Sequence, residues 1–271
     1  MSGTAGVHDG LVRTLRSRRR PLGASKSLID DRWAFRSYRR LFGAEDLHSH
    51  YRWAAVKPYI DFAAEKTLEV GGGDGRISFE VVDHGHRGSI HITEFDPSLV
   101  SEAERIRGRG GYANVAVSQR DLRQLSSDTS FDQVLAIDVL EHIDDDALAV
   151  EEIAAAMAPG AQVVVSVPTP RYPTVFGRAF HEHLGHVRDG YWHEDLERLF
   201  EGAGLQPVSH RYYTGAWVSR ACRLFYGMGI PYWIGVLWAP LVRPLLLRTE
   251  RRASRTDACS VAFVAVKPAA S

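Results

Sequence analysis

Four glycines stand within positions 71–75, directly after the short β-branched run Thr67–Val70. Glycine loses more conformational freedom on folding than any other residue, so such a cluster is unfavourable unless the backbone needs it. A helix that begins after this kind of loop turns its free N–H groups toward the loop, and the missing side chains let a ligand approach the main chain. The stretch therefore predicts a strand, a ligand-binding turn and a helix.

β-branched runs recur along the chain, and helical patterns separate most of them. The expected strands are 67–70, 89–95, 114–118, 132–137, 162–167, 206–213 and 260–266. The expected helices are 76–84, 97–107, 145–157 and 193–203. Strand and helix in alternation at this spacing indicate an α/β fold, in which right-handed crossovers connect the strands of a mostly parallel sheet.

The glycine spacing distinguishes between two classes of nucleotide-binding loop. Gly71, Gly73 and Gly75 form G-x-G-x-G, and Glu69 precedes them by two positions. A dinucleotide fingerprint requires G-x-G-x-x-G, but its last position is occupied here by Arg76. The chain also contains no Tyr-x-x-x-Lys sequence, so a dehydrogenase is the weaker interpretation.

With this loop the chain resembles the class I S-adenosylmethionine-dependent methyltransferases of the small-molecule type. EVGGGDG is similar to their first motif, acid-x-G-x-G-x-G, and four later stretches match the family in the same order. These stretches are ITEFDPS, SQRDL, FDQVLAIDVLEHI and GHVRDGYWHEDLERLFEGAGL. The resemblance covers residues 68–205. It implies a doubly wound, Rossmann-like sheet of seven strands, mostly parallel with an antiparallel last strand, and helices on both faces.

The resemblance also implies a cofactor, S-adenosylmethionine, at the carboxyl ends of the first strands. The residues implied to bind it are Glu69, Gly71, Gly72, Gly73, Gly75, Glu94, Asp96, Asp121, Leu122 and Asp138. Asp96 would hold the ribose hydroxyls, because a carboxylate can accept two hydrogen bonds from a diol. Glu94 has the same strand parity and is the alternative. Asp121 would meet the adenine amino group, and Leu122 would flank the ring.

Histidines are the candidate catalytic residues, because a hydroxyl acceptor must lose its proton and imidazole suits that task near neutral pH. The candidates are His142, after the fourth expected strand, and His181, His183 and His186 in HEHLGH. A structural hydrogen bond is the alternative for His142. The H-x-H-x-x-H spacing is rich in metal ligands. No clear carboxylate triad accompanies it, however, so we expect no metal site.

The acceptor can be narrowed by elimination. The Asn/Asp-Pro-Pro-aromatic tetrad of DNA amino-methyltransferases is replaced by Asp-Val-Leu-Glu at 138–141, and neither Cys222 nor Cys259 is placed to serve as a nucleophile. The paired glutamates of arginine methyltransferases are not evident either. We therefore expect an enzyme that methylates a small apolar or lipid-linked acceptor, on a hydroxyl oxygen, with no nucleic-acid partner. The alternative is a non-catalytic binding protein or enzyme subunit with the same fold.

The remaining segments suggest how the chain is organised. Residues 1–27 are basic and predict a disordered arm, and 28–271 predict one domain, with a helical lid at 28–62 and an insertion at 214–257. Two cysteines cannot form a disulfide framework, and the N-terminus lacks an apolar secretory core, which favours a cytoplasmic protein.

The insertion contains the longest uncharged stretch of the chain. Leu224–Val242 has 19 residues without a charge, but two prolines and three glycines argue against a straight membrane span. Arginines follow it, namely Arg243, Arg248, Arg251, Arg252 and Arg255. This pattern fits peripheral contact with the inner membrane face, and it fits equally a buried cap over the acceptor pocket.

Overall fold

The computed structural model describes residues 47–125, 130–227 and 232–269. The predicted arm at 1–27, and the predicted lid up to residue 46, lie outside the described residues.

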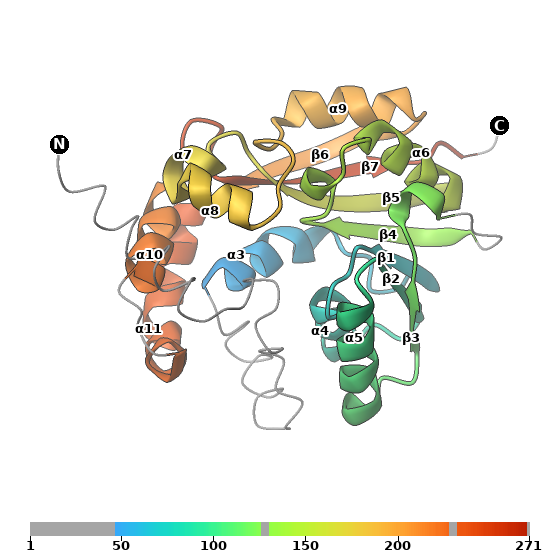
Figure 1. The fold of residues 1–271 in the computed structure, drawn as a ribbon, viewed down its shortest axis with the longest axis horizontal. Helices are drawn as coiled ribbons and strands as arrows, with labels where there is room; N and C mark the ends of the chain where they lie inside the picture. Colours follow the sequence, from blue (N-terminus) through green and yellow to red (C-terminus); the bar gives the residue numbers. More distant parts are fainter. Residues whose placement is uncertain (1–46, 126–129, 228–231, 270–271) are drawn as a thin grey trace.

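A seven-stranded sheet forms the centre of the molecule (Figure 1). Its strands are β1 (Lys66–Val70), β2 (Ser89–Glu94), β3 (Val115–Gln119), β4 (Phe131–Ile137), β5 (Met157–Pro168), β6 (Gln206–Tyr213) and β7 (Ser260–Val266). The spatial order is β3-β2-β1-β4-β5-β7-β6, and β7 alone runs antiparallel to both of its neighbours. The predicted fold class, including the antiparallel last strand, is confirmed.

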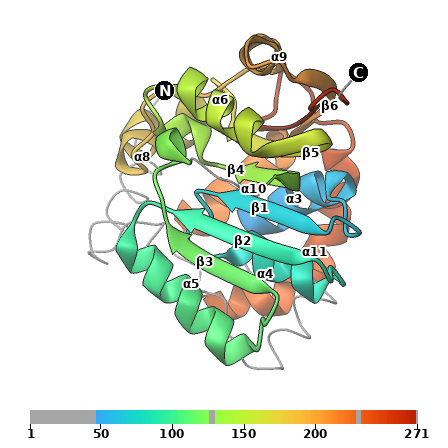
Figure 2. The ribbon, with the colours of Figure 1, turned by 90° about the vertical axis from the view of Figure 1, so that its right-hand side faces the viewer.

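Helices cover both faces of the sheet, as the strand pattern requires (Figure 2). Along β4, Val134 and Ala136 join the apolar cluster that also contains residues of α6 (Asp146–Ala156) and α9 (His193–Gly202). The alternate residues Leu135 and Ile137 join a second cluster, with residues of three other helices. These helices are α3 (Leu47–Val56), α4 (Arg76–Asp83) and α5 (Pro97–Gly110). A strand buried on both faces is therefore apolar at successive positions, because its side chains alternate between two cores.

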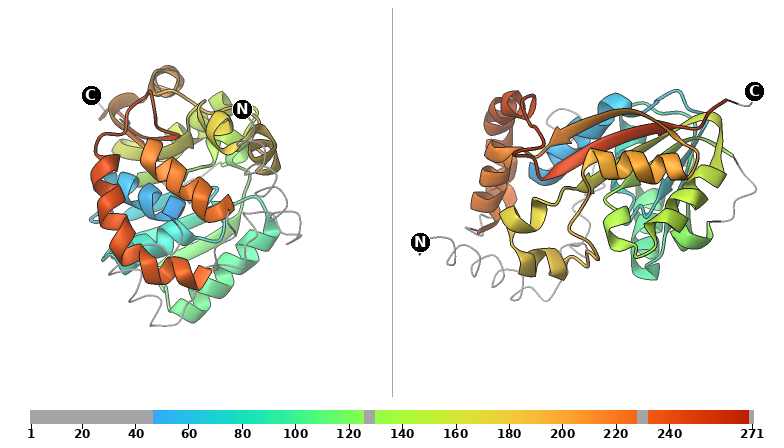
Figure 3. Two further views of the ribbon diagram at one scale, coloured as in Figure 1. Left: turned by 90° about the vertical axis from the view of Figure 1, so that its left-hand side faces the viewer. Right: turned by 90° about the horizontal axis from the view of Figure 1, so that it is seen from above.

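One edge of the sheet gathers the functional elements. The strands β1, β2, β4, β5 and β6 all end there, and β7 begins there. Short helices follow β5 and lie beyond this edge, namely α7 (Tyr172–Phe176) and α8 (Arg178–His183) (Figures 1 and 3). Ligands of open α/β sheets bind outside the carboxyl ends of the strands, so this is the edge to inspect for a site.

The segment between β6 and β7 contains two helices at the same edge, α10 (Ala216–Gly227) and α11 (Tyr232–Glu250) (Figure 3). Buried Glu250 ends α11 and accepts hydrogen bonds from the backbone N–H groups of Thr214, at 2.6 Å, and Gly215, at 2.9 Å. The end of the insertion is thereby tied to its beginning. The Tyr51 hydroxyl of α3 donates to the Arg243 carbonyl of α11 at 3.2 Å. No helix in the described ranges is long and apolar enough to cross a membrane.

Candidate functional site

The glycine loop after β1 has the conformation that only glycine adopts easily. Gly71, Gly73 and Gly75 have φ values of +59°, +58° and +81°. A Cβ atom at Gly71 would lie 2.3 Å from Val139, and one at Gly75 would lie 2.5 Å from Phe79. A Cβ atom at Gly73 would meet nothing within 4 Å. The outer glycines thus permit close packing, whereas the middle one borders open space where a ligand can approach.

Glu69 supports this loop from below. Its side chain is 2% exposed, and its carboxylate accepts hydrogen bonds from the backbone N–H of Ser78, at 3.1 Å, and from the Ser78 hydroxyl. A Cβ atom at Gly72 would lie only 3.0 Å from the Glu69 carboxyl carbon. Burial raises the pKa of Glu69 to about 7, although the bonds from Ser78 oppose the shift. Glu69, which the sequence predicts to bind the cofactor, therefore packs against the buried side of the glycine loop rather than facing the open space at Gly73.

The two acids at the end of β2 have different surroundings. The Glu94 carboxylate accepts from three backbone N–H groups: Gly73 at 2.8 Å, Phe95 at 2.7 Å and Asp96 at 2.9 Å. Asp96 begins α5 as its N-cap and accepts from the backbone N–H and the hydroxyl of Ser98, both at 2.7 Å. These bonds hold the pKa of Asp96 below its usual range. Glu94 faces the glycine loop, whereas the Asp96 carboxylate is engaged in helix capping.

The end of β3 lies beside these acids. Asp121 is the N-cap of the short helix η3 (Leu122–Gln124), and it also pairs with the Arg123 guanidinium at 2.7 Å. Leu122 is buried. The side chain of Gln119 donates to the Phe95 carbonyl at 3.0 Å, which links the ends of β2 and β3. Phe95 is 65% exposed and was not identified from the sequence. The sequence signal that could have identified Phe95 is its position as an apolar residue directly after an acid at the end of a strand.

Asp138, at the end of β4, has the strained backbone of a site residue. Its φ is +54°, which is uncommon for any residue other than glycine. The Asp138 carboxylate accepts from the Ser166 hydroxyl at 2.6 Å and from the Arg52 guanidinium at 2.5 Å. Burial alone would raise the pKa of Asp138, but the positive charges of Arg52 and His48 outweigh it and hold the pKa below its usual value. Arg52 is on α3 and belongs to none of the sequence motifs.

Three of the four candidate histidines come together next to Asp138. The rings of His142 and His186 have centroids 4.8 Å apart, and those of His181 and His186 are 4.5 Å apart. Burial, followed by the neighbouring His142 and His181, lowers the pKa of His186 to about 3, so this ring is neutral near pH 7. His183 is exposed on α8, whereas His181 on the same helix is buried. Side chains that are two positions apart on a helix point to opposite sides of it.

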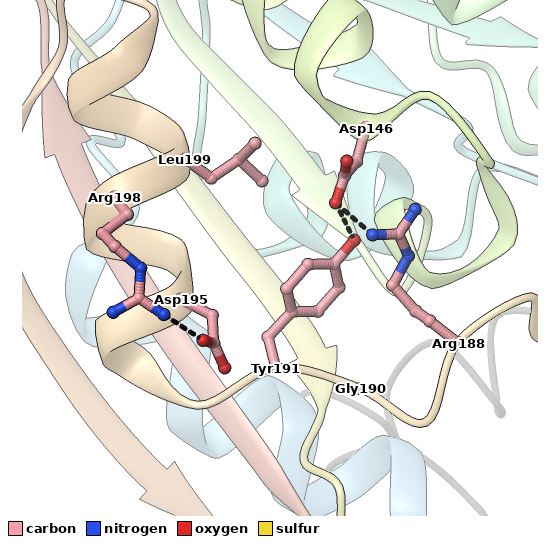
Figure 4. Close-up of a pocket in the computed structure, with 7 residues that line it drawn as sticks. All are labelled: Asp146, Arg188, Gly190, Tyr191, Asp195, Arg198 and Leu199. Carbon is pink, nitrogen blue, oxygen red and sulfur yellow. Dashed lines mark hydrogen bonds and ion pairs between the residues drawn. The ribbon is translucent and has the colours of Figure 1, made fainter.

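The segment that carries His186 is fastened to the loop after β4. Arg188 donates to the Asp146 carboxylate and to the carbonyl oxygens of Ile143, at 2.7 Å, and Asp144, at 2.9 Å. The Tyr191 hydroxyl donates to Asp146 at 2.9 Å, and Figure 4 shows both side chains converging on that carboxylate. These residues line a pocket bounded also by α9. They hold His186 beside His142.

Glu141 is buried in the same place, at 1% exposure. Burial, and then the negative charge of Asp138, raises the pKa of Glu141 well above its ordinary value. Its Oε2 atom has no hydrogen-bond partner among the described residues. Glu141 directly precedes His142 in the motif FDQVLAIDVLEHI, but the lack of a described hydrogen-bond partner for its Oε2 atom becomes visible only in the structure.

The comparisons with known proteins agree with this geometry. Residues 68–163, from β1 into β5, match the family model of the methyltransferase domain. This stretch, which includes the glycine loop, Glu94, Asp121 and Asp138, is therefore similar to a methyltransferase domain. The comparison with curated proteins gave no match.

Solved structures show the same fold at low sequence identity. Phosphoethanolamine N-methyltransferase 2 of Haemonchus contortus, in complex with S-adenosyl-L-methionine, has a TM-score of 0.59 at 16% identity, over 89% of this chain and 58% of that one. A complex of the Haloferax volcanii Trm112 methyltransferase activator with a methyltransferase has a TM-score of 0.57 at 18%, over 87% and 96%. The [4+2]-cyclase SpnF has a TM-score of 0.57 at 19% identity, over 98% of this chain and 94% of that one.

The donors at this edge of the sheet fit S-adenosylmethionine, the cofactor that the resemblance implies. An open position at Gly73 and the carboxylate of Glu94 lie together, as an adenosine requires. Asp138 and Arg52 offer an anion and a cation for the ammonium and carboxylate of a methionyl group. The individual residue assignments remain predictions.

The buried Glu69 predicts a pH-dependent stability. An unfolded glutamate titrates near 4.5, against about 7 in the folded chain. The contribution of Glu69 is fully present below pH 4.5 and is lost as the pH rises through 7, because the unfolded state releases its proton first. The loss is at most about 3 kcal/mol. Glu69→Gln should remove this slope.

Urea denaturation between pH 4.5 and pH 8 measures the free energy of unfolding for this test. Glu65→Gln is the matched control, because Glu65 is exposed just before β1 and should leave the slope unchanged. A Glu69→Gln variant whose stability parallels that of the wild type across the range would contradict the assignment.

Proposed function

We propose that this chain is an S-adenosylmethionine-dependent methyltransferase that acts on a small apolar or lipid-linked acceptor, at a hydroxyl oxygen. The observation that carries the proposal is the contact between the open glycine loop and Glu94, at the carboxyl edge of a methyltransferase domain. Methyl transfer is a displacement at the sulfonium carbon, for which the cofactor supplies the reactive group. The protein must bind, orient and, for a hydroxyl, remove a proton.

The cofactor would be held by residues at the ends of β1, β2 and β3. Glu94 is our choice for the ribose hydroxyls, because its carboxylate lies against the open position at Gly73, whereas the Asp96 carboxylate caps α5. Exposed Phe95 offers a ring face for the adenine, and Leu122 would flank the ring as the resemblance implies. Asp121 remains the proposed partner of the adenine amino group. Glu69 and the glycines Gly71, Gly72 and Gly75 shape the loop, and Gly73 leaves it open.

The acceptor proton would go to the histidine cluster. His142 is exposed, and its Nδ1 atom lies 3.2 Å from the Gly185 carbonyl. A neutral imidazole that donates from Nδ1 carries its lone pair on Nε2, where it can accept a proton. His186 is the neighbouring neutral imidazole. His183 lies outside this group of contacts, so we prefer His142 as the proton acceptor and His186 as the residue that positions it.

The surroundings of the cluster favour an apolar acceptor. Tyr172, Phe176 and Phe180 follow β5 and pack with Tyr51 and Val218 in one apolar cluster. The Tyr172 ring contacts His186 at a centroid distance of 5.7 Å. An apolar wall beside a deprotonating group suits a phenol or a lipid-linked hydroxyl better than a strongly hydrated amine.

The alternative is a protein with this fold that binds without transferring a methyl group, or that acts as a subunit. SpnF is described as a [4+2]-cyclase, and the Haloferax volcanii structure contains a methyltransferase activator. These neighbours favour keeping the alternative, since fold alone does not specify function. Methylation of an amine is the other open chemistry, because the Haemonchus contortus neighbour is an N-methyltransferase.

We also propose that the enzyme is cytoplasmic and docks on the inner membrane face. Four apolar side chains of α10 and α11 are 60–65% exposed: Trp217, Leu224, Leu241 and Leu245. Arg248, Arg251 and Arg252 are exposed nearby in the chain, whereas Arg243 of the same basic set is buried. Exposed apolar and basic groups on one helical insertion are typical of interfacial elements.

The ribose assignment predicts that Glu94→Ala weakens binding of S-adenosylhomocysteine at least tenfold, because each hydrogen bond to a charged group contributes about 1.5–3 kcal/mol. Asp96→Ala should mainly lower stability, by about 0.5–2 kcal/mol, through loss of the N-cap. Titration calorimetry and thermal unfolding separate the two effects. If Asp96→Ala weakens binding more than Glu94→Ala does, the ribose belongs to Asp96.

The acceptor assignment predicts turnover with hydroxyl compounds. Release of S-adenosylhomocysteine should depend on a phenol, quinone precursor, polyketide or glycolipid, and should not occur with phosphoethanolamine or sarcosine. His142→Asn should lower kcat about 10²–10⁴-fold, as expected for loss of a proton-accepting group. Turnover with amines alone would favour N-methylation, and cofactor binding without any turnover would favour the non-catalytic alternative.

The docking proposal predicts flotation with anionic vesicles. The triple variant Trp217→Ser, Leu241→Ser and Leu245→Ser should lose most of this binding, and high salt should weaken it, since each arginine near the surface contributes about 1 kcal/mol. Val208→Ser is the matched control, because Val208 is 61% exposed on β6. Absence of flotation by the wild type at low salt would leave the insertion as a cap over the pocket.

A further inference from the structure

We propose that Glu141, His142 and His186 bind one divalent transition-metal ion beside the methyl-transfer site. One potential ligand atom from each residue lies within 4.8 Å of the others. Two imidazoles and one carboxylate are a donor set suited to ions from Mn²⁺ to Zn²⁺. The sequence predicts no metal, because no clear carboxylate triad accompanies HEHLGH. The carboxylate comes instead from the loop after β4.

Both histidines already have the outer contacts that metal ligands require. The Nδ1 atom of His142 lies 3.2 Å from the Gly185 carbonyl, and Nδ1 of His186 lies 2.9 Å from Nδ1 of His181. Liganding histidines usually engage their second nitrogen in this way, which fixes the tautomer and the ring orientation. Each ring can therefore present Nε2 to an ion.

The third ligand is a buried group that needs a partner. Glu141 is 1% exposed, and its Oε2 atom accepts no hydrogen bond from the described residues. Burial of a carboxyl oxygen without a hydrogen-bond partner is unfavourable. A cation between Glu141 and the two imidazoles would supply that contact, and this is the observation that separates the cluster from a chance meeting of polar side chains.

The framework of the site is fixed before an ion arrives. The backbone N–H of Val187 donates to the Glu141 carbonyl at 2.9 Å, and Arg188 holds the same two segments together. Ligand atoms around a small divalent ion are at most about 4.2 Å apart, since each bond is about 2.1 Å. The ligand atoms lie within 4.8 Å of one another, so the contraction that an ion requires is small, and exposed His142 is the side chain that can move.

The role of the ion rests on the proposed function. A hydroxyl oxygen of the acceptor would occupy an open coordination position, which lowers its pKa so that its proton passes to solvent. The oxygen then forms a bond to the methyl carbon as the carbon–sulfur bond breaks, and S-adenosylhomocysteine leaves. The ion would thus favour an oxygen acceptor and would replace His142 as the group that promotes deprotonation.

A second group of possible ligands provides an internal comparison. His193, Glu197 and His210 also have ligand atoms within 4.8 Å of one another, between α9 and β6. There the Nδ1 atom of His193 lies 2.9 Å from the Tyr212 hydroxyl, and the two histidine rings stack at 3.9 Å. His210 is exposed. A loss of metal binding on substitution of His210 would therefore show that the ion binds at this surface group rather than at the proposed site.

The experiment is titration of the full chain, prepared without a polyhistidine tag, with Co²⁺ alone. Visible d–d absorption and equilibrium dialysis measure coordination and stoichiometry without any turnover. We expect one Co²⁺ per chain, with affinity at least tenfold weaker in Glu141→Gln, His142→Asn and His186→Asn. His183→Asn and His210→Asn should retain it. His142 is exposed, so its variant remains informative if Glu141→Gln fails to fold.

Binding of S-adenosylhomocysteine, measured in parallel by calorimetry, keeps the two proposals separate. Co²⁺ affinity that survives in both His142→Asn and His186→Asn, or that is lost only in His210→Asn, would overturn the metal site. The same holds if wild-type protein binds no Co²⁺. Wild-type protein that binds Co²⁺ but does not bind S-adenosylhomocysteine would count against the methyltransferase proposal instead.

Discussion

Parallel pairing of β1 with both of its neighbours is the constraint on which the rest of the site depends. Val70 is in register with Thr93 of β2 and with Ala136 of β4, so the three strands reach the edge of the sheet together. The residues that follow are then forced into proximity: the glycine loop, Glu94 and Asp138. Their side chains need no long-range attraction to meet, because backbone hydrogen bonds within the sheet have already aligned them.

Local chemistry explains how much could be predicted from the sequence. The strands β2, β6 and β7 and the helix α9 lie within one residue of the predicted ranges, because β-branched runs and apolar periodicity are properties of neighbouring residues. The glycine loop could also be predicted, because its G-x-G-x-G spacing lies within five consecutive residues. The sequence does not distinguish Asp96 from Glu94, since a strand-end acid followed by Pro-Ser can also be a helix N-cap, and the capping hydrogen bonds of Asp96 become visible only in the structure.

The parts that could not be predicted are tertiary. Arg52 reaches Asp138 across 86 residues, and Arg188 reaches Asp146 across 42. Neither arginine belongs to a pattern that spacing could reveal. The four candidate histidines were indistinguishable in sequence, but burial and neighbours divide them into a contacting group of three and exposed His183. Glu141 likewise became a candidate ligand only through the absence of a described hydrogen-bond partner for its Oε2 atom.

The position of β7 has a consequence for how the chain acquires its structure. This strand lies between β5 and β6, and the Thr169 hydroxyl after β5 donates to the Ala258 carbonyl, 89 residues later. Contacts between such distant residues slow folding, because the loop between them must close before the contacts form. Until β7 arrives, β5 and β6 each present an unpaired edge, which is the kind of surface that promotes aggregation. The link from Glu250 to Thr214 and Gly215 shortens this search, since it brings the chain back to the gap that β7 must fill.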